Sequence, residues 1–445
     1  MKKSVLALFV VLIASPVSAA DPLAENTRAA LKKATAYFRS ISTNGGYCGI
    51  YSLDLKKRYG ESLYEKAKST EIWIQPPGTP SVGQAFLRAY HATGDSYFLD
   101  AARAAGRALA WGQSTCGGWD HRANVSHLKP ESERPQRKKK YGAFDDNITQ
   151  GALTFLIHLD EVLDEPWLDD AVALALQFML DSQFENGAWP QWFPLRGGYH
   201  NHYTYNDSAI NDCIRVMFFA HQIYHRDKYL RSARRGGDFI LASQQPAPQA
   251  GWAQQYAHDL KPAWARTFEP PGVCSAVTAH NIHTLVDLYL YTKDEKYLKA
   301  IPSAVAWLEK SRLQPGKNLW ARLYEVGTNK PIYGDRKDGN KIHYDYDKIS
   351  EFEKTHYGWR GNYGSAAIAY YQRLKNLGLE KFLAGRDVTL TPEQKKARAR
   401  QLAPRIQSLI DRLDNRGRWI ANNTIRSATF VANANQLCQY LELAK

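Results

Sequence analysis

One pattern recurs four times along the chain and constrains its fold more than any other feature. Each copy begins with an aromatic residue and a Leu, continues through a helix-forming stretch to a Gln or Arg, and ends in a Gly-containing turn with a Trp. The successive Trp residues lie 70, 63 and 68 positions apart, and the aromatic-Leu pairs lie 69, 62 and 68 apart. Tyr47 lies 72 positions before the first Trp, and Gly417-Arg418-Trp419 fits a sixth turn. The four turns carry Trp119, Trp189, Trp252 and Trp320.

A second helical stretch lies between each Trp turn and the next aromatic-Leu pair. Its apolar residues recur at intervals of three and four, as in Leu153, Leu156 and Leu159. Each unit is therefore a helix pair, which cannot bury its apolar face alone and must stack on its neighbours. The repeat predicts an all-α fold: an α/α toroid, or incomplete α/α barrel, of helix pairs with long loops forming a cleft on one rim. An open solenoid is the main alternative.

The same rhythm bears on domain organisation. A chain of 445 residues suggests two or three domains by length alone, but the repeat favours one toroidal domain over residues 20–445, with residues 371–445 supplying the closing helices. Residues 1–19 combine two lysines, an apolar run and Val17-Ser18-Ala19. This arrangement predicts a secretory signal peptide. We expect the protein to be secreted or periplasmic.

The charge balance limits the classes of molecule that the protein is expected to bind. There are 58 Lys and Arg against 44 Asp and Glu, and loss of the two lysines of the predicted signal peptide leaves a balance of +12. An exported protein this basic fits an anionic partner or, equally well on charge alone, a soluble basic surface, whereas export makes nucleic acid unsuitable. Beyond the N-terminus no apolar run approaches the ~20 residues of a membrane span, so no membrane partner is expected. We expect a monomer.

The five cysteines bear on cross-linking. In an oxidising compartment they permit up to two disulfides and leave one thiol. Cys48 and Cys116 lie in corresponding loops of adjacent repeats, so they are candidates for one disulfide. No CxxC pair or clustered Cys/His spacing indicates a zinc site.

The repeat predicts where functional side chains gather. One helix of each unit starts after a Trp turn, so these starts should meet on one rim of the ring. Two of them carry aspartates, Asp145 and Asp207, at positions 62 residues apart. Asp is a common helix N-cap, which is the structural alternative for each residue. Two aspartates in register beside aromatic-rich loops favour a site.

Three loops near that rim have the composition of a binding site. The loop over residues 189–205 is dense in aromatic and imidazole side chains, as sugar-binding subsites are, although a rigid plug over the core has the same composition. The loops over 254–271 and 320–336 supply cations, and Arg is suited to fork-like pairing with carboxylates. These loops therefore predict a ligand that carries carboxylates. The cationic candidates are Lys261, Arg266, Arg322 and Arg336.

Five sequence blocks occur in order with compatible gaps, at residues 144–149, 186–195, 203–207, 261–270 and 322–332. Together they resemble the signature blocks of the family 10 pectate lyases, and the likeness covers roughly residues 81–364. The resemblance implies an α/α toroid that cleaves polygalacturonate, an anionic uronate polysaccharide, by calcium-assisted β-elimination.

The resemblance also implies roles for individual residues. Calcium takes six to eight oxygen ligands, so two aspartates make an incomplete cage that the substrate carboxylate and water should complete. The implied Ca²⁺-associated residues are Asp145 and Asp207, the catalytic base is Arg266, and Arg322 and Arg336 bind substrate carboxylates with Lys261 beside them. From the aromatic loop, Trp189 and Tyr205 are further candidates for substrate binding.

An arginine base is chemically demanding because guanidinium is almost always protonated. Calcium, Lys261 and the other arginines are expected to favour the neutral form of Arg266 by like-charge repulsion. The sequence therefore predicts an alkaline optimum and sensitivity to chelators.

Differences from the family pattern leave the uronate open. Ala188 stands where Gly is usual, Cys274 follows the fourth block, and residues 120–141 form a polar insertion with a basic run. Such a run is usually a solvated loop, but on the rim it would lengthen a site for an anionic polymer. Polymers of glucuronate, mannuronate or partly esterified galacturonate are the alternatives.

Two other classes of protein fit parts of the pattern. A glycoside hydrolase on the same toroid would use Asp145 or Asp146 with Asp207 or Asp212, because hydrolysis needs two carboxylates about 5–9.5 Å apart. A non-catalytic uronate-binding protein is the third class. The reaction products distinguish these classes. Elimination leaves an unsaturated chromophore, hydrolysis leaves none, and a binding protein does not depolymerise the polymer.

Overall fold

The computed structural model describes residues 21–126, 141–386 and 389–445. The predicted signal peptide at residues 1–19 and the basic run of the insertion, at 137–140, lie outside the described residues. Within the described part, no helix combines the length and apolar character needed to cross a membrane. The helices are α1 (Pro22–Ser40), α2 (Thr79–Thr93), α3 (Ser96–Gly112), α4 (Ile148–Asp160), α5 (Pro166–Asp181), α6 (Ala209–Tyr224), α7 (Asp227–Ala242), α8 (Ser275–Thr292), α9 (Ile301–Lys310), α10 (Glu351–His356), α11 (Ser365–Ala384), α12 (Pro392–Asp411) and α13 (Ser427–Leu443).

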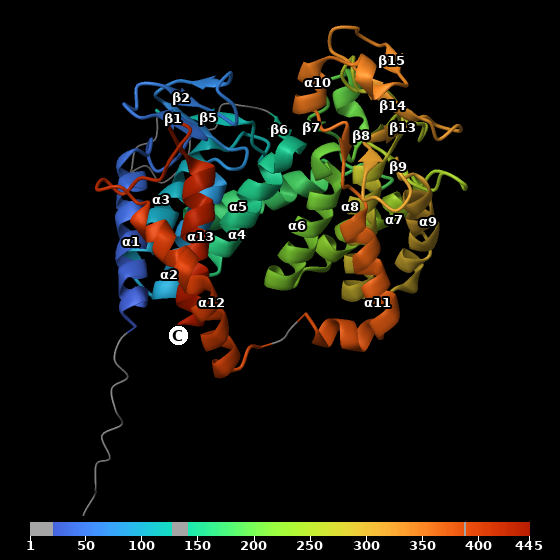
Figure 1. Cartoon of the computed structure of the whole chain (residues 1–445). Coiled ribbons are helices and arrows are strands. Elements are labelled where there is room, and N and C mark those ends of the chain that lie inside the picture. Colours follow the sequence, from blue (N-terminus) through green and yellow to red (C-terminus); the bar gives the residue numbers. More distant parts are fainter. Residues whose placement is uncertain (1–20, 127–140, 387–388) are drawn as a thin grey trace, which may run out of the picture.

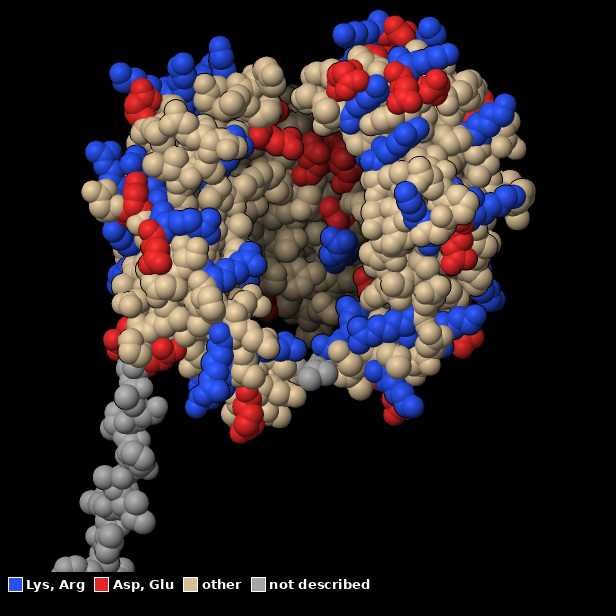
Figure 2. Space-filling model, viewed as in Figure 1, with Lys and Arg blue, Asp and Glu red and all other residues tan. Residues whose placement is uncertain are grey.

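The helices form an incomplete ring in two layers (Figure 1). Inner helices contact their neighbours in the order α13, α2, α4, α6, α8 and α11, and outer helices such as α3, α5 and α7 pack behind them. Figure 2 shows a deep hollow inside the ring. The predicted α/α toroid is confirmed, and the open solenoid is not observed. A single domain over residues 20–445 stays a prediction.

A buried tryptophan closes each repeat. The four repeat tryptophans are 0% exposed, and the indole N–H of each donates to a carbonyl near the end of the preceding helix. Trp419 makes the same bond, at 2.9 Å to the Leu409 carbonyl, so the sixth turn is also confirmed. The four bonds are Trp119 to Leu109 (2.9 Å), Trp189 to Met179 (2.9 Å), Trp252 to Ile240 (2.7 Å) and Trp320 to Leu308 (2.6 Å).

The repeated glutamine joins one unit to the next. Gln113 Nε2 donates to the carbonyl of Gly117 in its own turn at 2.8 Å and to that of Ala171 in α5 at 2.9 Å. Gln183 bridges Gly187 and Ser232 in the same way. Buried polar groups need such partners, so the glutamines of the repeat serve the ring rather than a ligand.

Short strands cover the upper rim of the ring in Figure 1. In one five-stranded sheet, β11 pairs antiparallel with both β13 and β9, and β14 continues the sheet from the central strand, β13. This sheet joins loops that lie far apart in sequence. The strands are β1 (Ile50–Ser52), β2 (Arg58–Tyr59), β3 (Lys66–Ala67), β4 (Glu71–Trp73), β5 (Arg122–Asn124), β6 (Gly142–Ala143), β7 (Trp192–Phe193), β8 (Tyr203–Thr204), β9 (Trp252–Ala253), β10 (Gln255–Tyr256), β11 (Val273–Cys274), β12 (Trp320–Ala321), β13 (Leu323–Tyr324), β14 (Pro331–Gly334), β15 (Ile342–His343), β16 (Arg360–Gly361), β17 (Ile420–Ala421) and β18 (Thr424–Arg426).

The predicted disulfide between Cys48 and Cys116 is wrong. All five cysteines are free. Cys48 follows Tyr47 whereas Cys116 precedes Trp119, so the two do not occupy equivalent places in their turns. Each thiol also has its own neighbour: Cys48 Sγ lies 3.5 Å from the Glu71 carbonyl oxygen, and Cys116 Sγ lies 3.1 Å from Ser114 Oγ. Burial raises the pKa of the Cys48 thiol to about 12.

Candidate active site

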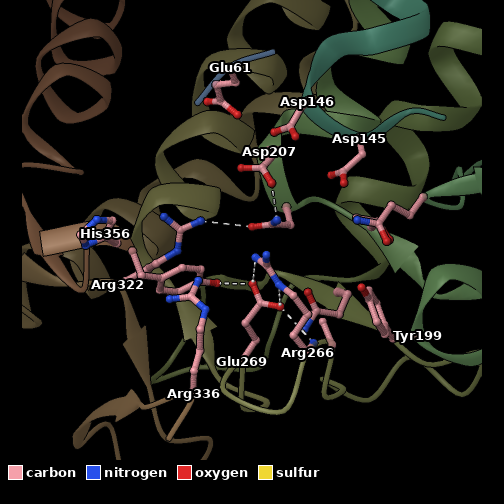
Figure 3. Close-up of a pocket in the computed structure, with 16 residues that line it drawn as sticks. Glu61, Asp145, Asp146, Tyr199, Asp207, Arg266, Glu269, Arg322, Arg336 and His356 are labelled. Carbon is pink, nitrogen blue, oxygen red and sulfur yellow. Dashed lines mark hydrogen bonds and ion pairs between the residues drawn. The ribbon is translucent and has the colours of Figure 1, made fainter. Parts of the chain in front are cut away.

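A charged cavity of about 340 Å³ opens on the strand-covered rim. Figure 3 shows carboxylates on one side of it and guanidinium groups on the other. In Figure 2, acidic side chains gather at the top of the hollow. We call the carboxylates of Glu61, Asp145, Asp146 and Asp207 the acidic wall, and the guanidinium groups of Arg266, Arg322 and Arg336 the basic wall.

Two matching turns place the aspartates. The 3₁₀ turn η1 (Asp145–Asn147) precedes α4, and η3 (Asn206–Ser208) precedes α6. The last two residues of each turn have left-handed backbone: φ is 48° at Asp146 and 56° at Asn147, and 49° at Asp207 and 63° at Ser208. Asp146 is therefore the structural equivalent of Asp207. The predicted equivalence of Asp145 and Asp207 is wrong by one residue, although the three carboxylates share one cavity.

The aspartates do not cap their helices. No side-chain capping hydrogen bond forms at η1, α4, η3 or α6. Non-glycine residues with positive φ are uncommon and cluster at functional sites. The N-cap interpretation is thus wrong for Asp145 and Asp207, and the turns direct carboxylates into the cavity (Figure 3).

The acidic wall carries uncompensated negative charge. Burial, together with the neighbouring carboxylates of Asp145, Asp207 and Glu61, raises the pKa of Asp146 to about 7. Burial and Asp145 raise the pKa of Asp207 to about 6, against the opposing effect of Arg322 and Arg266. Asp145 Oδ1 is buried and has no hydrogen-bond partner within the described residues. An orphaned acceptor among crowded carboxylates fits a cation.

The donor set suits calcium better than zinc. One ligand atom each from His121, Asp145 and Asp146 lie within 4.8 Å of one another. Calcium prefers carboxylate oxygens over imidazole nitrogen, so Asp145 and Asp146, with Asp207 beside them on the acidic wall, are the residues that fit it. Gln75 Nε2 donates to Asp146 Oδ2 at 3.1 Å and to Glu61 Oε2 at 2.9 Å, which ties Glu61 to this wall.

Arg266 in the basic wall is already paired. Its Nε and Nη2 donate to the two carboxylate oxygens of Glu269 at 2.8 and 2.7 Å, and the Glu269 side chain is only 3% exposed. This two-pronged hydrogen bond raises the pKa of Arg266 above its ordinary value. The expected lowering by neighbouring cations is therefore wrong for this arrangement, because the charge closest to Arg266 is a carboxylate.

The other two arginines are held differently. Arg336 Nη1 donates to the fully buried Glu353 at 2.7 Å. Arg322 is bound by neutral amides, with Nε 2.8 Å from Gln254 Oε1 and Nη2 3.1 Å from Asn206 Oδ1. In the described part of the chain Arg322 forms no ion pair, so its charge remains available to an anion.

Three of the predicted binding residues lie elsewhere. Trp189 is 0% exposed and closes its repeat, and Tyr205 is 0% exposed with its hydroxyl 2.8 Å from Ser243 Oγ. Both assignments are wrong, because the packing of the ring needs these side chains. Lys261 does not line the cavity either: its side chain is 81% exposed and pairs with Asp259 at 2.9 Å. Tyr199 and Tyr357 are the aromatic residues that line the cavity.

Sequence reasoning missed several members of the site. Glu269 follows Arg266 by three residues on the same proline-stiffened loop, and that spacing is a signal for a local ion pair. The sequence predicts a role for Asp146 only as a hydrolytic carboxylate. Glu61 comes from a loop between β2 and β3 that has no repeat counterpart, so no local signal identifies it.

The geometry removes Asp212 from the hydrolase alternative but leaves Asp207 in the same cavity as Asp145 and Asp146. Asp212 points to a second cavity between α6 and α8 and pairs with Arg215 at 2.7 Å. It does not line the charged cavity with Asp145 and Asp146.

Comparison with known proteins agrees with this fold. A family model for pectic acid lyases matches residues 113–316 and 312–368. A search of curated proteins finds no match. The family 10 polysaccharide lyase from Cellvibrio cellulosa is 23% identical, with a TM-score of 0.52, and the match covers 66% of this chain and 97% of that one. A mutant of that family from the same organism, in complex with trigalacturonic acid, is 23% identical with a TM-score of 0.50, over 65% and 98% of the two chains.

The fold and the charged cleft define a polysaccharide-degrading enzyme built on an α/α toroid. The family match covers more than half of the chain, so the chain belongs to the pectic acid lyase family. The protein is thus a polysaccharide lyase, and the resemblance to the family 10 pectate lyases is confirmed.

Proposed function

We propose that the protein is a calcium-dependent pectate lyase that cleaves polygalacturonate by β-elimination. The observation that carries the proposal is the acidic wall facing the basic wall across one cavity. A uronate chain brings a carboxylate beside every bond to be cleaved, and that carboxylate matches the arginines directly. The Cellvibrio lyase complex with trigalacturonic acid supports the same ligand class.

Calcium fits the acidic wall. The buried acceptor of Asp145 lacks a partner, and mutual repulsion raises the pKa of both Asp146 and Asp207. These three carboxylates would hold the ion, leaving ligand positions for the substrate carboxylate and water. When bound, the ion neutralises the uronate carboxylate and so stabilises the negative charge that develops beside it.

The basic wall supplies the remaining chemistry. Arg322 and Arg336 neutralise uronate carboxylates, and Arg266 accepts the proton from C5, the carbon α to the carboxylate. The C5–H electron pair forms the C4–C5 double bond as the bond from C4 to the glycosidic oxygen breaks, and the departing oxygen then takes a proton from solvent. Elimination needs both charge neutralisation and a base, and this cavity offers both.

Glu269 has two opposing effects on this reaction. It fixes the guanidinium of Arg266 through Nε and Nη2 and leaves Nη1 for the substrate. It also stabilises the protonated form, so the neutral base becomes available only at alkaline pH. The ion pair with Glu269 therefore makes activity depend on alkaline pH more strongly than the sequence alone predicts.

The proposal extends to the setting of the reaction. The predicted signal peptide supports an exported enzyme, secreted or periplasmic, and the basic balance of the chain supports an anionic polymer as its substrate. The proposal includes a monomeric enzyme. The proposal keeps residues 20–445 as one catalytic domain.

A panel of polymers tests the substrate class. The enzyme is incubated with calcium and polygalacturonate, partly esterified pectin, polyglucuronate or polymannuronate, and the ultraviolet absorbance of the unsaturated product is followed. Polygalacturonate should give the fastest rise. New reducing ends without absorbance would establish hydrolysis, and a faster rise on another polymer would reassign the uronate.

A further inference from the structure

A second cavity lies between α6 and α8 on the inner side of the ring, and the proposed reaction does not use it. Its volume is about 270 Å³, and Asn211, Phe218, His283 and Thr284 are among its lining residues. Ser208, which follows Asp207 directly, also lines it. This inner cavity therefore begins beside the acidic wall.

The wall of the inner cavity holds buried amides with free hydrogen-bonding atoms. Asn211 is 2% exposed and Asn281, behind it, is 0% exposed. Asn211 Nδ2 donates to Asn281 Oδ1 and to Thr284 Oγ1, both at 2.8 Å. Asn211 Oδ1 and Asn281 Nδ2 then have no partner among the described residues. Buried polar groups are rarely left unpaired, and Asn211 lines the cavity, so a small rotation of its amide would present this acceptor to a hydroxyl donor on a bound molecule.

The charges around the inner cavity are balanced. Arg215 pairs with Asp212 at 2.7 Å, and Asp287 contacts Arg386 at 3.3 Å. Burial lowers the pKa of His283, so its imidazole is neutral at pH 7 and offers one donor and one acceptor. The inner cavity thus differs from the charged cavity, whose walls carry unpaired charge of both signs.

We propose that the inner cavity binds one uncharged sugar ring. Sugar hydroxyls both donate and accept hydrogen bonds, as Asn211 and His283 require, and Phe218 offers an apolar face. The volume lies just below the ~300–1,000 Å³ typical of sites for drug-sized ligands, which fits a single ring. The balanced charges disfavour a uronate there.

One consequence rests on the proposed function. Because the inner cavity adjoins Asp207, a neutral branch on a uronate chain enters it while the chain lies across the charged cavity. The enzyme then prefers uronate polymers with neutral side groups over unbranched ones.

Calorimetric titration of the full chain with galactose, arabinose, rhamnose and xylose tests the binding step, with glycerol as the non-ring control. At least one sugar should bind with millimolar affinity. His283→Phe keeps the ring beside Tyr370 but removes its hydrogen bonds, and should weaken that affinity at least fivefold. Thr284→Val, which removes a lining hydroxyl with little change in shape, should also weaken it.

The matched control is His221→Phe. His221 lies on α6 and contacts the Tyr291 hydroxyl at 2.7 Å, outside the inner cavity. It should leave sugar affinity unchanged, as should Arg266→Ala. The absence of binding by every neutral sugar, or equal affinities in His283→Phe and the unmodified chain, overturns the proposal. Galacturonate binding that depends on His283 overturns the choice of a neutral ring.

The polymer step has a separate readout. In His283→Phe, the ratio of kcat/KM on a branched polymer to kcat/KM on an unbranched one should fall at least threefold. An unchanged ratio overturns this step. If the protein cleaved neither polymer but bound neutral sugars through His283, the proposed function would be contradicted. The assignment of the inner cavity as a sugar-binding site would still stand.

Discussion

The two walls of the charged cavity differ in how their charges are compensated. On the acidic wall three aspartates crowd together, the pKa values of Asp146 and Asp207 rise to about 7 and 6, and one buried oxygen has no partner within the described chain. On the basic wall Arg266 and Arg336 each rest on a buried glutamate, Glu269 and Glu353.

This difference indicates what each wall lacks. We propose that a cation completes the acidic wall, because its crowded carboxylates and orphaned oxygen fit a metal ion. The basic wall is already ordered by its glutamates, so its guanidinium groups are preorganised for carboxylates at little further cost. Changing one wall at a time should therefore affect different steps of the reaction.

Removal of Arg266 should have the largest effect. Arg266→Ala should lower kcat by about 10²–10⁴-fold, the usual contribution of a general base, while affinity for trigalacturonate stays within a few-fold because Arg322 and Arg336 remain. Product absorbance gives kcat and calorimetry gives affinity. An unchanged kcat would assign the base to another residue.

Neutralising the acidic wall should weaken calcium binding next most strongly. Asp146→Asn or Asp207→Asn should each lower calcium affinity by about 10–100-fold, since each removes a charged ligand. Asp160→Asn, at the far end of α4, is the matched control and should leave affinity unchanged. Equal calcium affinity in all three variants would move the metal site elsewhere.

The same wall predicts how calcium affinity depends on pH. The raised pKa values mean that protons compete with the ion below about pH 7 at Asp146 and below about pH 6 at Asp207. Affinity in the unmodified chain should fall as the pH is lowered from 8 to 5.5. A flat profile in calorimetric titrations would show that these carboxylates do not bind the ion.

Glu269→Gln should shift the pH profile by a smaller amount. Loss of the carboxylate removes the main cause of the raised pKa of Arg266, so the neutral base forms at lower pH. The pH at which kcat rises should therefore be lower by about one pH unit or more. A profile that keeps its midpoint while the rate falls would mean that Arg266 acts only as a fixed cation.

Trp189→Phe should have the smallest effect on catalysis. It removes the indole bond to the Met179 carbonyl and leaves that buried acceptor with only the Ser182 hydroxyl, at 3.2 Å, so the free energy of unfolding should fall by about 1–3 kcal/mol. Urea unfolding measures the loss. A normal kcat in the folded variant would confirm that Trp189 belongs to the ring, and a raised KM with normal stability would contradict that placement.

The repeat made most of the fold predictable. Trp119, Trp189, Trp252 and Trp320 recur because each closes the same turn, so spacing alone indicates helix pairs around an axis. It also located the aspartates and arginines on one rim. The spacing of the repeats could not distinguish buried aromatic residues from exposed ones. Trp189 and Tyr205 belong to recognisable motifs because they pack inside the ring, and not because they bind a ligand. The spacing also could not identify Glu61, whose approach to Asp146 depends on the folded loop.

The central claim is that both walls act together in calcium-dependent elimination. The most direct test is the initial rate of absorbance on polygalacturonate from pH 6 to pH 10, with calcium, with chelator, and after calcium is restored. The account predicts a rate that rises well above neutral pH, disappears with chelator and returns with calcium. A chelator-resistant enzyme with a neutral optimum would contradict it.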